Sequence, residues 1–134
     1  MPSALARVSL STVVGTVLVL GVLPGCKLVE EMKNGPRPRH VIEKQAAEAY
    51  AEGRYEVAAA DYEEILERKP DEVWARYELG RTYLAMNQPI KAREQLIVAY
   101  DVDPSNEKVI DALAQAYYDA KEYDKLTGFL RRLA

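Results

Sequence analysis

From Arg39 onward the chain repeats with a period of about 34 residues, a length that is typical of helical repeat proteins. Pro70 and Pro104 lie one period apart, and each follows a stretch in which apolar residues recur at helical spacing. A fixed period indicates a solenoid, in which each repeat is a pair of helices and stacked neighbours bury a continuous core. No alternating strand pattern and no Asn-Gly hairpin signal interrupts the repeats. We therefore predict an all-α domain with repeats at residues 39–72, 73–106 and 107–134.

Small side chains recur at matching positions of these repeats. They are Ala46, Gly80 and Ala114 in the first helix of each repeat, and Ala58 and Ala92 in the second. Small residues here allow the two helices of a repeat to approach closely. Leu126 takes the corresponding position in the last repeat, so we expect its two helices to pack less closely. The predicted helices are at about 40–52, 55–69, 73–86, 89–102, 107–119 and 122–133.

The middle repeat carries the clearest motif, which consists of Leu79-Gly80, Tyr83, Ala92, Leu96, Ala99 and Pro104. This arrangement resembles the tetratricopeptide repeat (TPR), in which Leu-Gly, Tyr, Ala, a large residue and Pro follow at fixed offsets. The first repeat matches at Tyr55, Ala58, Tyr62, Ile65 and Pro70, and the third at Leu113, Ala114, Tyr117, Tyr123, Leu130 and Leu133. The resemblance implies a TPR α-solenoid of about three helix-turn-helix repeats, preceded by a signal peptide and a short linker.

The resemblance also implies where a ligand binds, because the first helices of TPR units line a concave groove. The candidate groove residues of this chain are Tyr50, Trp74, Tyr77, Arg81, Leu84, Gln115 and Tyr118. Trp, Tyr and Arg dominate the binding energy of protein interfaces, so Trp74, Tyr77 and Arg81 are the main candidates. The alternative for Trp74 is burial at the junction with the first repeat.

The residue types in the groove limit the ligand. TPR domains that clamp the C-terminal carboxylate of chaperones need Lys and Asn at two positions that Glu43 and Ala47 occupy here. The resemblance therefore argues against that ligand. We expect instead a peptide with apolar anchors and one acidic group for Arg81.

The segment from Met1 to Cys26 differs in composition from the rest of the chain. Between Met1 and Gly25 the only charged side chain is Arg7, and an apolar stretch covers residues 8–22. A positive start, an apolar middle and small residues at a cleavage point are the layout of a secretory signal peptide. We expect a signal peptide at residues 1–25 and a flexible, Pro- and Gly-containing tether at residues 26–38.

The end of this segment resembles the lipobox of bacterial lipoproteins, in which Leu precedes a Cys by three residues with small residues between them. Leu23, Gly25 and Cys26 match this pattern, and Pro24 stands where Ala, Ser or Thr is usual. The resemblance implies cleavage before Cys26 and a covalent lipid on its thiol, with no other cofactor. Lys27, rather than Asp, then favours the outer membrane. The alternative is an uncleaved anchor in which Cys26 is a buried apolar residue.

Composition excludes several classes of function. The formal net charge is −3, so the chain lacks the basic footprint of a nucleic-acid-binding protein. Its single cysteine and single histidine, Cys26 and His40, are too few for a disulfide, a typical zinc site or a His-based triad. We find no nucleophile–base pair and no phosphate-binding glycine loop, and we predict that the chain is not an enzyme.

These features predict a lipid-anchored TPR adaptor of the bacterial cell envelope. It would face the periplasm and bind another envelope protein, as the resemblance to pilotins and pilus-assembly TPR lipoproteins implies. The alternatives are an accessory subunit of an envelope enzyme and a cytoplasm-facing scaffold on an uncleaved anchor. In the last helix, Phe129, Leu130 and Leu133 predict an apolar edge for self-association or a partner, unless its polar side chains cover the stack.

Overall fold

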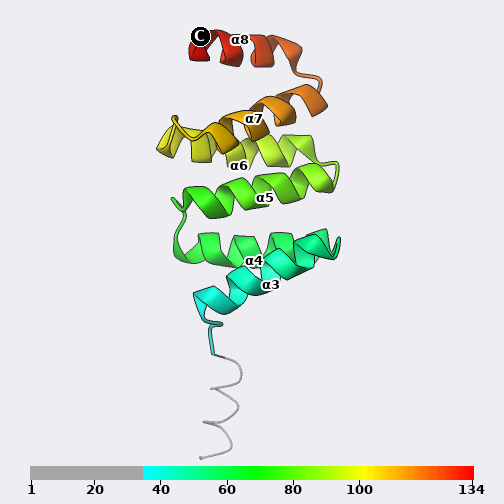
Figure 1. Cartoon of the computed structure of the whole chain (residues 1–134), viewed down its shortest axis with the longest axis vertical. Coiled ribbons are helices and arrows are strands. Elements are labelled where there is room, and N and C mark those ends of the chain that lie inside the picture. Colours follow the sequence, from blue (N-terminus) through cyan, green and yellow to red (C-terminus); the bar gives the residue numbers. More distant parts are fainter. Residues whose placement is uncertain (1–34) are drawn as a thin grey trace, which may run out of the picture. The chain divides into compact units, whose positions relative to one another are not determined.

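A computed structural model of the chain describes residues 35–134, where every regular element is a helix. The helices are α3 (Arg39–Ala51), α4 (Tyr55–Arg68), α5 (Val73–Ala85), α6 (Pro89–Val102), α7 (Glu107–Asp119) and α8 (Tyr123–Leu133). They follow one another in a stack, so that each helix lies beside the next one in the chain (Figure 1). The predicted all-α architecture of stacked helix pairs is confirmed, and each predicted helix boundary lies within one residue of the observed one.

The turn inside each repeat has the same structure in all three. Gly53, Asn87 and Lys121 have φ angles of 76°, 56° and 59°, which is the left-handed region. The backbone amide of the residue that follows donates a hydrogen bond to the carbonyl oxygen five residues earlier, as Arg54 N does to Ala49 O at 2.8 Å. This is the Schellman arrangement that ends many helices, and glycine is its usual left-handed residue. Successive members of this set are one period apart, so the turns repeat in step with the sequence.

Lys121 is the member of this set whose conformation is most unfavourable in free energy, because Gly and Asn adopt positive φ more readily than Lys does. We expect Lys121→Gly to stabilise the fold by about 1 kcal/mol. The matched substitution Gly53→Ala, at the equivalent turn, should destabilise it by a similar amount. Urea unfolding followed by circular dichroism measures both values. Equal and opposite effects are expected, and a destabilising Lys121→Gly would contradict the assignment of strain to this turn.

The connections between repeats use proline. α4 and α6 end at Arg68 and Val102, and Lys69 and Asp103 then adopt extended backbone with φ angles of −144° and −135°. Each of these two residues precedes a proline, whose ring disfavours helical backbone in the residue before it. The prediction that Pro70 and Pro104 mark the ends of the second helices is therefore confirmed.

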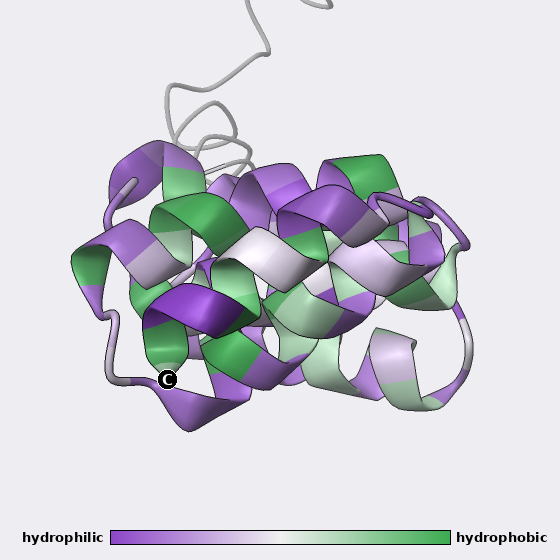
Figure 2. Cartoon of the chain, turned by 90° about the horizontal axis from the view of Figure 1, so that it is seen from above, coloured by the Kyte–Doolittle hydropathy of each residue, from purple (hydrophilic) through white to green (hydrophobic). Residues whose placement is uncertain are grey.

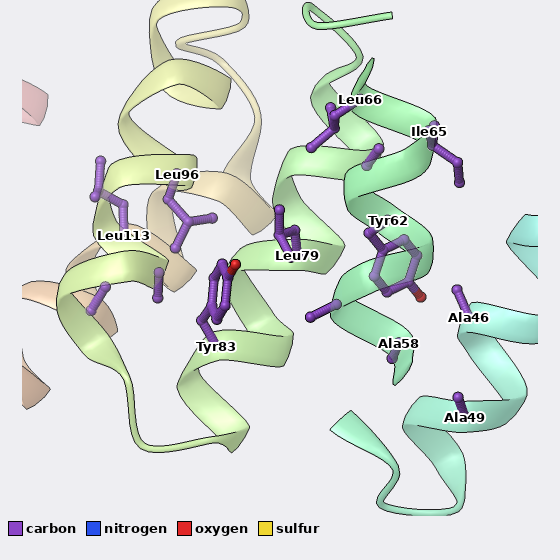
Figure 3. Packing of buried hydrophobic residues seen from close by; sticks show 14 of the residues in the cluster. Ala46, Ala49, Ala58, Tyr62, Ile65, Leu66, Leu79, Tyr83, Leu96 and Leu113 are labelled. Atoms are coloured by element: carbon purple, nitrogen blue, oxygen red, sulfur yellow. The ribbon is translucent and has the colours of Figure 1, made fainter. Parts of the chain in front are cut away.

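The core consists of apolar side chains between neighbouring helices. Figure 3 shows Leu79, Tyr83 and Leu96 in the space between α5 and α6. Gly80 is required here, because a Cβ on this residue would lie 2.6 Å from the Cγ of Leu96. Leu96 itself is fully buried. The predicted role of the small residue, which is to let the two helices approach closely, is confirmed at this repeat.

The last repeat packs differently. α7 and α8 contact each other over a smaller surface than the other two helix pairs do, as Leu126 predicts. Phe129 does not lie at an open edge. It is buried with its ring centroid 5.3 Å from that of Tyr100 and 5.8 Å from that of Tyr117. The view from above in Figure 2 shows hydrophobic and hydrophilic residues alternating along the helices, and Leu130 and Leu133 of α8 stay exposed.

The helical unit begins at Arg37, two residues before the predicted boundary. The guanidinium of Arg37 lies 2.7 Å from Asp61 Oδ1 and also pairs with Glu64, both on α4. Its backbone carbonyl accepts a hydrogen bond from Arg68 Nη1 at 2.6 Å. Asp61 is buried, and a buried carboxylate needs such a partner. Arg37 therefore belongs with the helices by its contacts, although we assigned it to the tether from the sequence.

Candidate functional site

Arg81 of α5 lies between two tyrosine rings. Its guanidinium carbon is 4.9 Å from the ring centroid of Tyr50 on α3 and 5.6 Å from that of Tyr77. Both distances are within the range of about 6 Å for a cation–π contact. Its Nη2 also donates to the hydroxyl of Tyr50 at 3.5 Å, which is a weak contact. The structure thus brings together three of the predicted groove residues, from two different repeats.

The charge of Arg81 already has a partner. Its Nη1 lies 3.0 Å from Glu78 Oε2, one turn earlier on the same helix. Burial lowers the pKa of the Arg81 guanidinium, but the charge of Glu78 and the contacts with Tyr50 and Tyr77 together outweigh burial, so the net pKa is raised. Arg81 is therefore a fixed cation that Glu78 neutralises locally, and the attraction that it offers to an incoming acidic group is reduced.

Trp74 combines the two alternatives that the sequence left open. Its ring packs edge-to-face on Tyr62 of α4, with the centroids 5.8 Å apart, so it does lie at the junction with the first repeat. Even so, 39% of Trp74 remains exposed. Burial also raises the pKa of the Tyr62 hydroxyl to about 12, so this hydroxyl stays neutral beneath the indole. One side of the Trp74 ring is thus held by Tyr62, and the exposed part of the ring is accessible to a ligand.

Trp74 and Tyr77 line a cleft of about 390 Å³ at the junction of the second and third repeats. The other lining residues come from the start of α5, from the α6–α7 connection and from the start of α7, and they are Glu72, Val73, Glu78, Asp103, Asn106 and Lys108. Asn106 is held by its role as the N-cap of α7, where its side chain accepts from Val109 N at 3.3 Å. The α7 end of the cleft is thus fixed by capping, whereas Glu72, the N-cap of α5, makes no side-chain capping bond.

The cleft carries more acidic than basic groups. Three carboxylates, those of Glu72, Glu78 and Asp103, line it with the single ammonium group of Lys108. A hydrogen bond from Lys69 and then the charge of Arg39 hold the pKa of Glu72 below its usual range, although burial opposes them. Glu72 therefore stays ionised at neutral pH, but Arg39 at 3.0 Å and Lys69 at 3.1 Å pair with it, as Arg81 pairs with Glu78. Within residues 35–134 Asp103 makes no ion pair, so the negative charge that the cleft offers beside its two aromatic faces comes mainly from Asp103.

The remaining predicted groove residues lie elsewhere. Leu84 is partly buried and packs against the core. Gln115 is exposed on α7 and donates from Nε2 to Asp119 at 2.6 Å. Tyr118 is exposed and pairs edge-to-face with Tyr123 of α8, with the centroids 5.8 Å apart. None of these three side chains lines the cleft that Trp74 and Tyr77 share.

The sequence reasoning missed the acidic residues of the cleft. Glu78 carries a local signal, because it stands three residues before Arg81 on one helix, where opposite charges pair. Asp103 carries no such signal. It reaches the cleft because the connection before Pro104 returns the chain to the start of the next first helix, which depends on how the repeats stack. His40 is exposed near the start of α3, as expected.

Other kinds of site can be considered only for residues 35–134. In that part of the chain, no three His, Cys, Asp or Glu side chains are grouped so that they could hold a metal ion. None of the helices α3 to α8 is long and apolar enough to cross a membrane. The predicted lipidation site and lipobox, Cys26, Leu23 and Gly25, lie outside the described residues.

Comparisons with known proteins agree with this geometry. A family model described as tetratricopeptide repeat matches residues 49–99. No curated protein matches the chain. The TPR domain of Arabidopsis OM64 is 16% identical, with 70% of this chain and 78% of that chain covered and a TM-score of 0.64. MamA (MSR-1 C2) is 18% identical, with 80% and 66% covered and a TM-score of 0.62. At these identities the likeness shows the fold, and together the matches support a TPR protein.

Proposed function

We propose that this chain is a protein-binding adaptor that holds a segment of another protein against Trp74 and Tyr77. The observation that carries the proposal is the cleft of about 390 Å³ in which an indole, a phenol and three carboxylates face one ligand-sized space. Trp74 is exposed and Tyr77 is half-buried, and Trp and Tyr side chains on a rigid base are the usual anchors of a binding hot spot. A TPR solenoid supplies that base, because the repeats fix the helix ends around the cleft.

The contacts of Arg81 change the ligand that we expect. The sequence suggested an acidic group for Arg81, but Glu78 already pairs with it. The cleft itself combines aromatic faces with the carboxylate of Asp103, which makes no ion pair within residues 35–134. We therefore propose that the bound segment places an apolar side chain on Trp74 and a Lys or Arg next to it. A cation there would meet the Asp103 carboxylate and the aromatic faces.

A photo-crosslinking residue placed at Tyr77 tests this proposal, with the same residue at Val57 as the control. Val57 is 45% exposed on α4 and does not line the cleft. We expect the probe at Tyr77, but not that at Val57, to capture a protein whose crosslinked segment contains a basic residue beside an apolar one. Capture from both positions alike would contradict a cleft-specific ligand.

Once that segment is known, Tyr77→Ala measures how much the cleft contributes. We expect an affinity loss of roughly 30-fold, equal to the 2 kcal/mol that defines a hot spot. Val57→Ala should leave the affinity unchanged, since it shortens an equally apolar side chain outside the cleft. Titration of the synthetic segment by calorimetry gives both values, and circular dichroism checks that helicity is retained. Equal affinities for the two variants would exclude the cleft as the binding site.

The membrane part of the proposal comes from the sequence alone. We propose that Cys26 carries the lipid and that the adaptor works in the bacterial cell envelope, on the periplasmic side of the outer membrane. Its support is the apolar stretch that ends at Leu23 to Cys26, together with Lys27 after the cysteine. Identification of the crosslinked partner separates the alternatives. A membrane-assembly protein favours the adaptor, an envelope enzyme favours an accessory subunit, and a cytoplasmic protein favours an uncleaved anchor.

A further inference from the structure

Three apolar side chains on the last repeat form an exposed surface in the described part of the chain. They are Tyr118 of α7 with Tyr123 and Leu130 of α8, and they are 58%, 52% and 48% exposed. We call these three residues the terminal platform. The two tyrosine rings are ordered against each other, edge-to-face at 5.8 Å, so the surface is preformed.

The first repeat contains a related surface in a covered state, with a tyrosine at the position of Leu130. Tyr50, Tyr55 and Tyr62 stand two periods before the members of the terminal platform. Tyr50 and Tyr55 form the same edge-to-face pair, with centroids 5.4 Å apart. Tyr62, however, is only 2% exposed, because α5 of the next repeat lies against it. Helix α5 is therefore an example, within this chain, of a helix that binds such a surface.

Three residues of α5 make the covering contacts. Trp74 packs on Tyr62 at 5.8 Å, and the guanidinium of Arg81 lies 4.9 Å from the ring of Tyr50. The hydroxyl of Tyr83 donates to a carboxylate oxygen of Glu63 on α4. Trp74, Arg81 and Tyr83 are positions i, i+7 and i+9 of one helix. The surface therefore binds side chains at fixed spacings along a helix.

The terminal platform differs from its covered counterpart in its third member, Leu130 in place of Tyr62, and in the charge of the next residue. Arg131 stands two periods after Glu63, and both side chains are exposed. A helix that covers the platform therefore meets a cation at the place where Tyr83 meets a carboxylate. An acidic side chain at i+9 complements it.

We propose that the terminal platform binds an amphipathic helix of another protein that carries an aromatic residue at i, an arginine at i+7 and an acidic residue at i+9. The aromatic side chain covers Leu130, the arginine stacks on Tyr118, and the carboxylate pairs with Arg131. This site is separate from the cleft at Trp74 and Tyr77, since no residue of the platform lines that cleft.

A second copy of the chain fits the platform less well. Head-to-tail stacking would place α3 on it, but Gln45 and Glu48 occupy the positions that correspond to the buried Leu79 and Thr82 of α5. Both of these α3 side chains are polar and exposed, and burying them without partners would be unfavourable. A two-fold contact centred on Leu130 would instead bring two copies of Arg131 together.

A helix-stapled peptide with the sequence of residues 73–85 and the substitution Tyr83→Glu is the probe, because an unconstrained peptide of this length is barely helical. We expect it to bind the full chain in a fluorescence titration. Peptide changes corresponding to Trp74→Ala or Arg81→Ala should each weaken binding at least about 10-fold. Retaining Tyr83 in the peptide should also weaken binding, because it leaves Arg131 without an acidic partner.

The protein variants are Leu130→Asp and the control Val57→Asp, which introduces the same charge at an exposed apolar residue of α4. We expect Leu130→Asp to lose peptide binding and Val57→Asp to retain it, with the helicity of both unchanged. Arg131→Glu should reverse the preference between the Glu and Tyr forms of the peptide. The proposal is overturned if the wild type does not bind the peptide, if Leu130→Asp still binds it, or if Leu130→Asp instead converts a dimer to a monomer in light scattering.

Discussion

The variant Cys26→Ala should incorporate no labelled palmitate. The wild-type protein should carry the label and sediment with membranes, because each buried methylene of an acyl chain contributes about 0.8 kcal/mol to membrane binding. A thioether-linked diacylglycerol with a further N-linked acyl chain exceeds the two signals that stable anchoring needs. Removing the thiol removes the attachment point of the first lipid, so the expected effect is complete loss of the label rather than a reduction.

Two further measurements make this experiment decisive. The substitution Pro24→Ala is the matched control, because it brings the lipobox closer to the usual pattern and should leave labelling intact. The mass of the mature protein reports cleavage before Cys26 independently of the label. Membrane attachment of an unlabelled, uncleaved wild type would exclude the lipoprotein and leave the segment before Cys26 as a transmembrane anchor.

The helices were predictable because their signals are local. A proline shortly after the end of α4 or α6, a left-handed turn at Gly53 and a small residue at Gly80 each act within a few residues of their own position. Repetition of these signals once per period then identifies them as one unit used three times. Such local signals therefore predict where the helices begin and end.

The site was predictable only in part, because its contacts join different repeats. Trp74, Tyr77 and Arg81 were identified by residue type and repeat position. Which partners they take was not predictable: Arg81 pairs with Glu78 on its own helix, while its guanidinium lies over Tyr50 in the repeat before. Such choices depend on the distance between stacked helices and on side-chain rotamers, and no periodic pattern encodes these.

The last helix shows the same limit. By type alone Phe129, Leu130 and Leu133 form one apolar edge, yet Phe129 is buried between Tyr100 and Tyr117 and the two leucines are exposed. Phe129 lies on the side of α8 that meets the preceding helices, whereas Leu130 lies on the side that meets a following helix in the earlier repeats. Successive residues of a helix point in directions about 100° apart, so one apolar residue can be buried while its neighbour in sequence is exposed.

The largest loss of stability is expected for Leu96→Ala. Leu96 is fully buried in the middle of the stack, and truncating such a residue costs about 2–5 kcal/mol through lost burial and the cavity that remains. Because α6 contacts both α5 and α7, we expect the whole stack to loosen rather than one repeat. Urea unfolding by circular dichroism measures the change, and Val98→Ala, an exposed apolar truncation on the same helix, is the control.

Leu96 also determines whether Gly80→Ala stabilises or destabilises the fold. In the wild-type background Gly80→Ala places a methyl group 2.6 Å from Leu96 Cγ, and overpacking of this kind costs about 1–3 kcal/mol. An alanine within a helix is favoured over glycine by about 1 kcal/mol, which offsets part of that loss. In the Leu96→Ala background the clash is gone, so only the helix preference remains and Gly80→Ala should become stabilising. A loss of equal size in both backgrounds would mean that close approach to Leu96 is not the reason for glycine at this position.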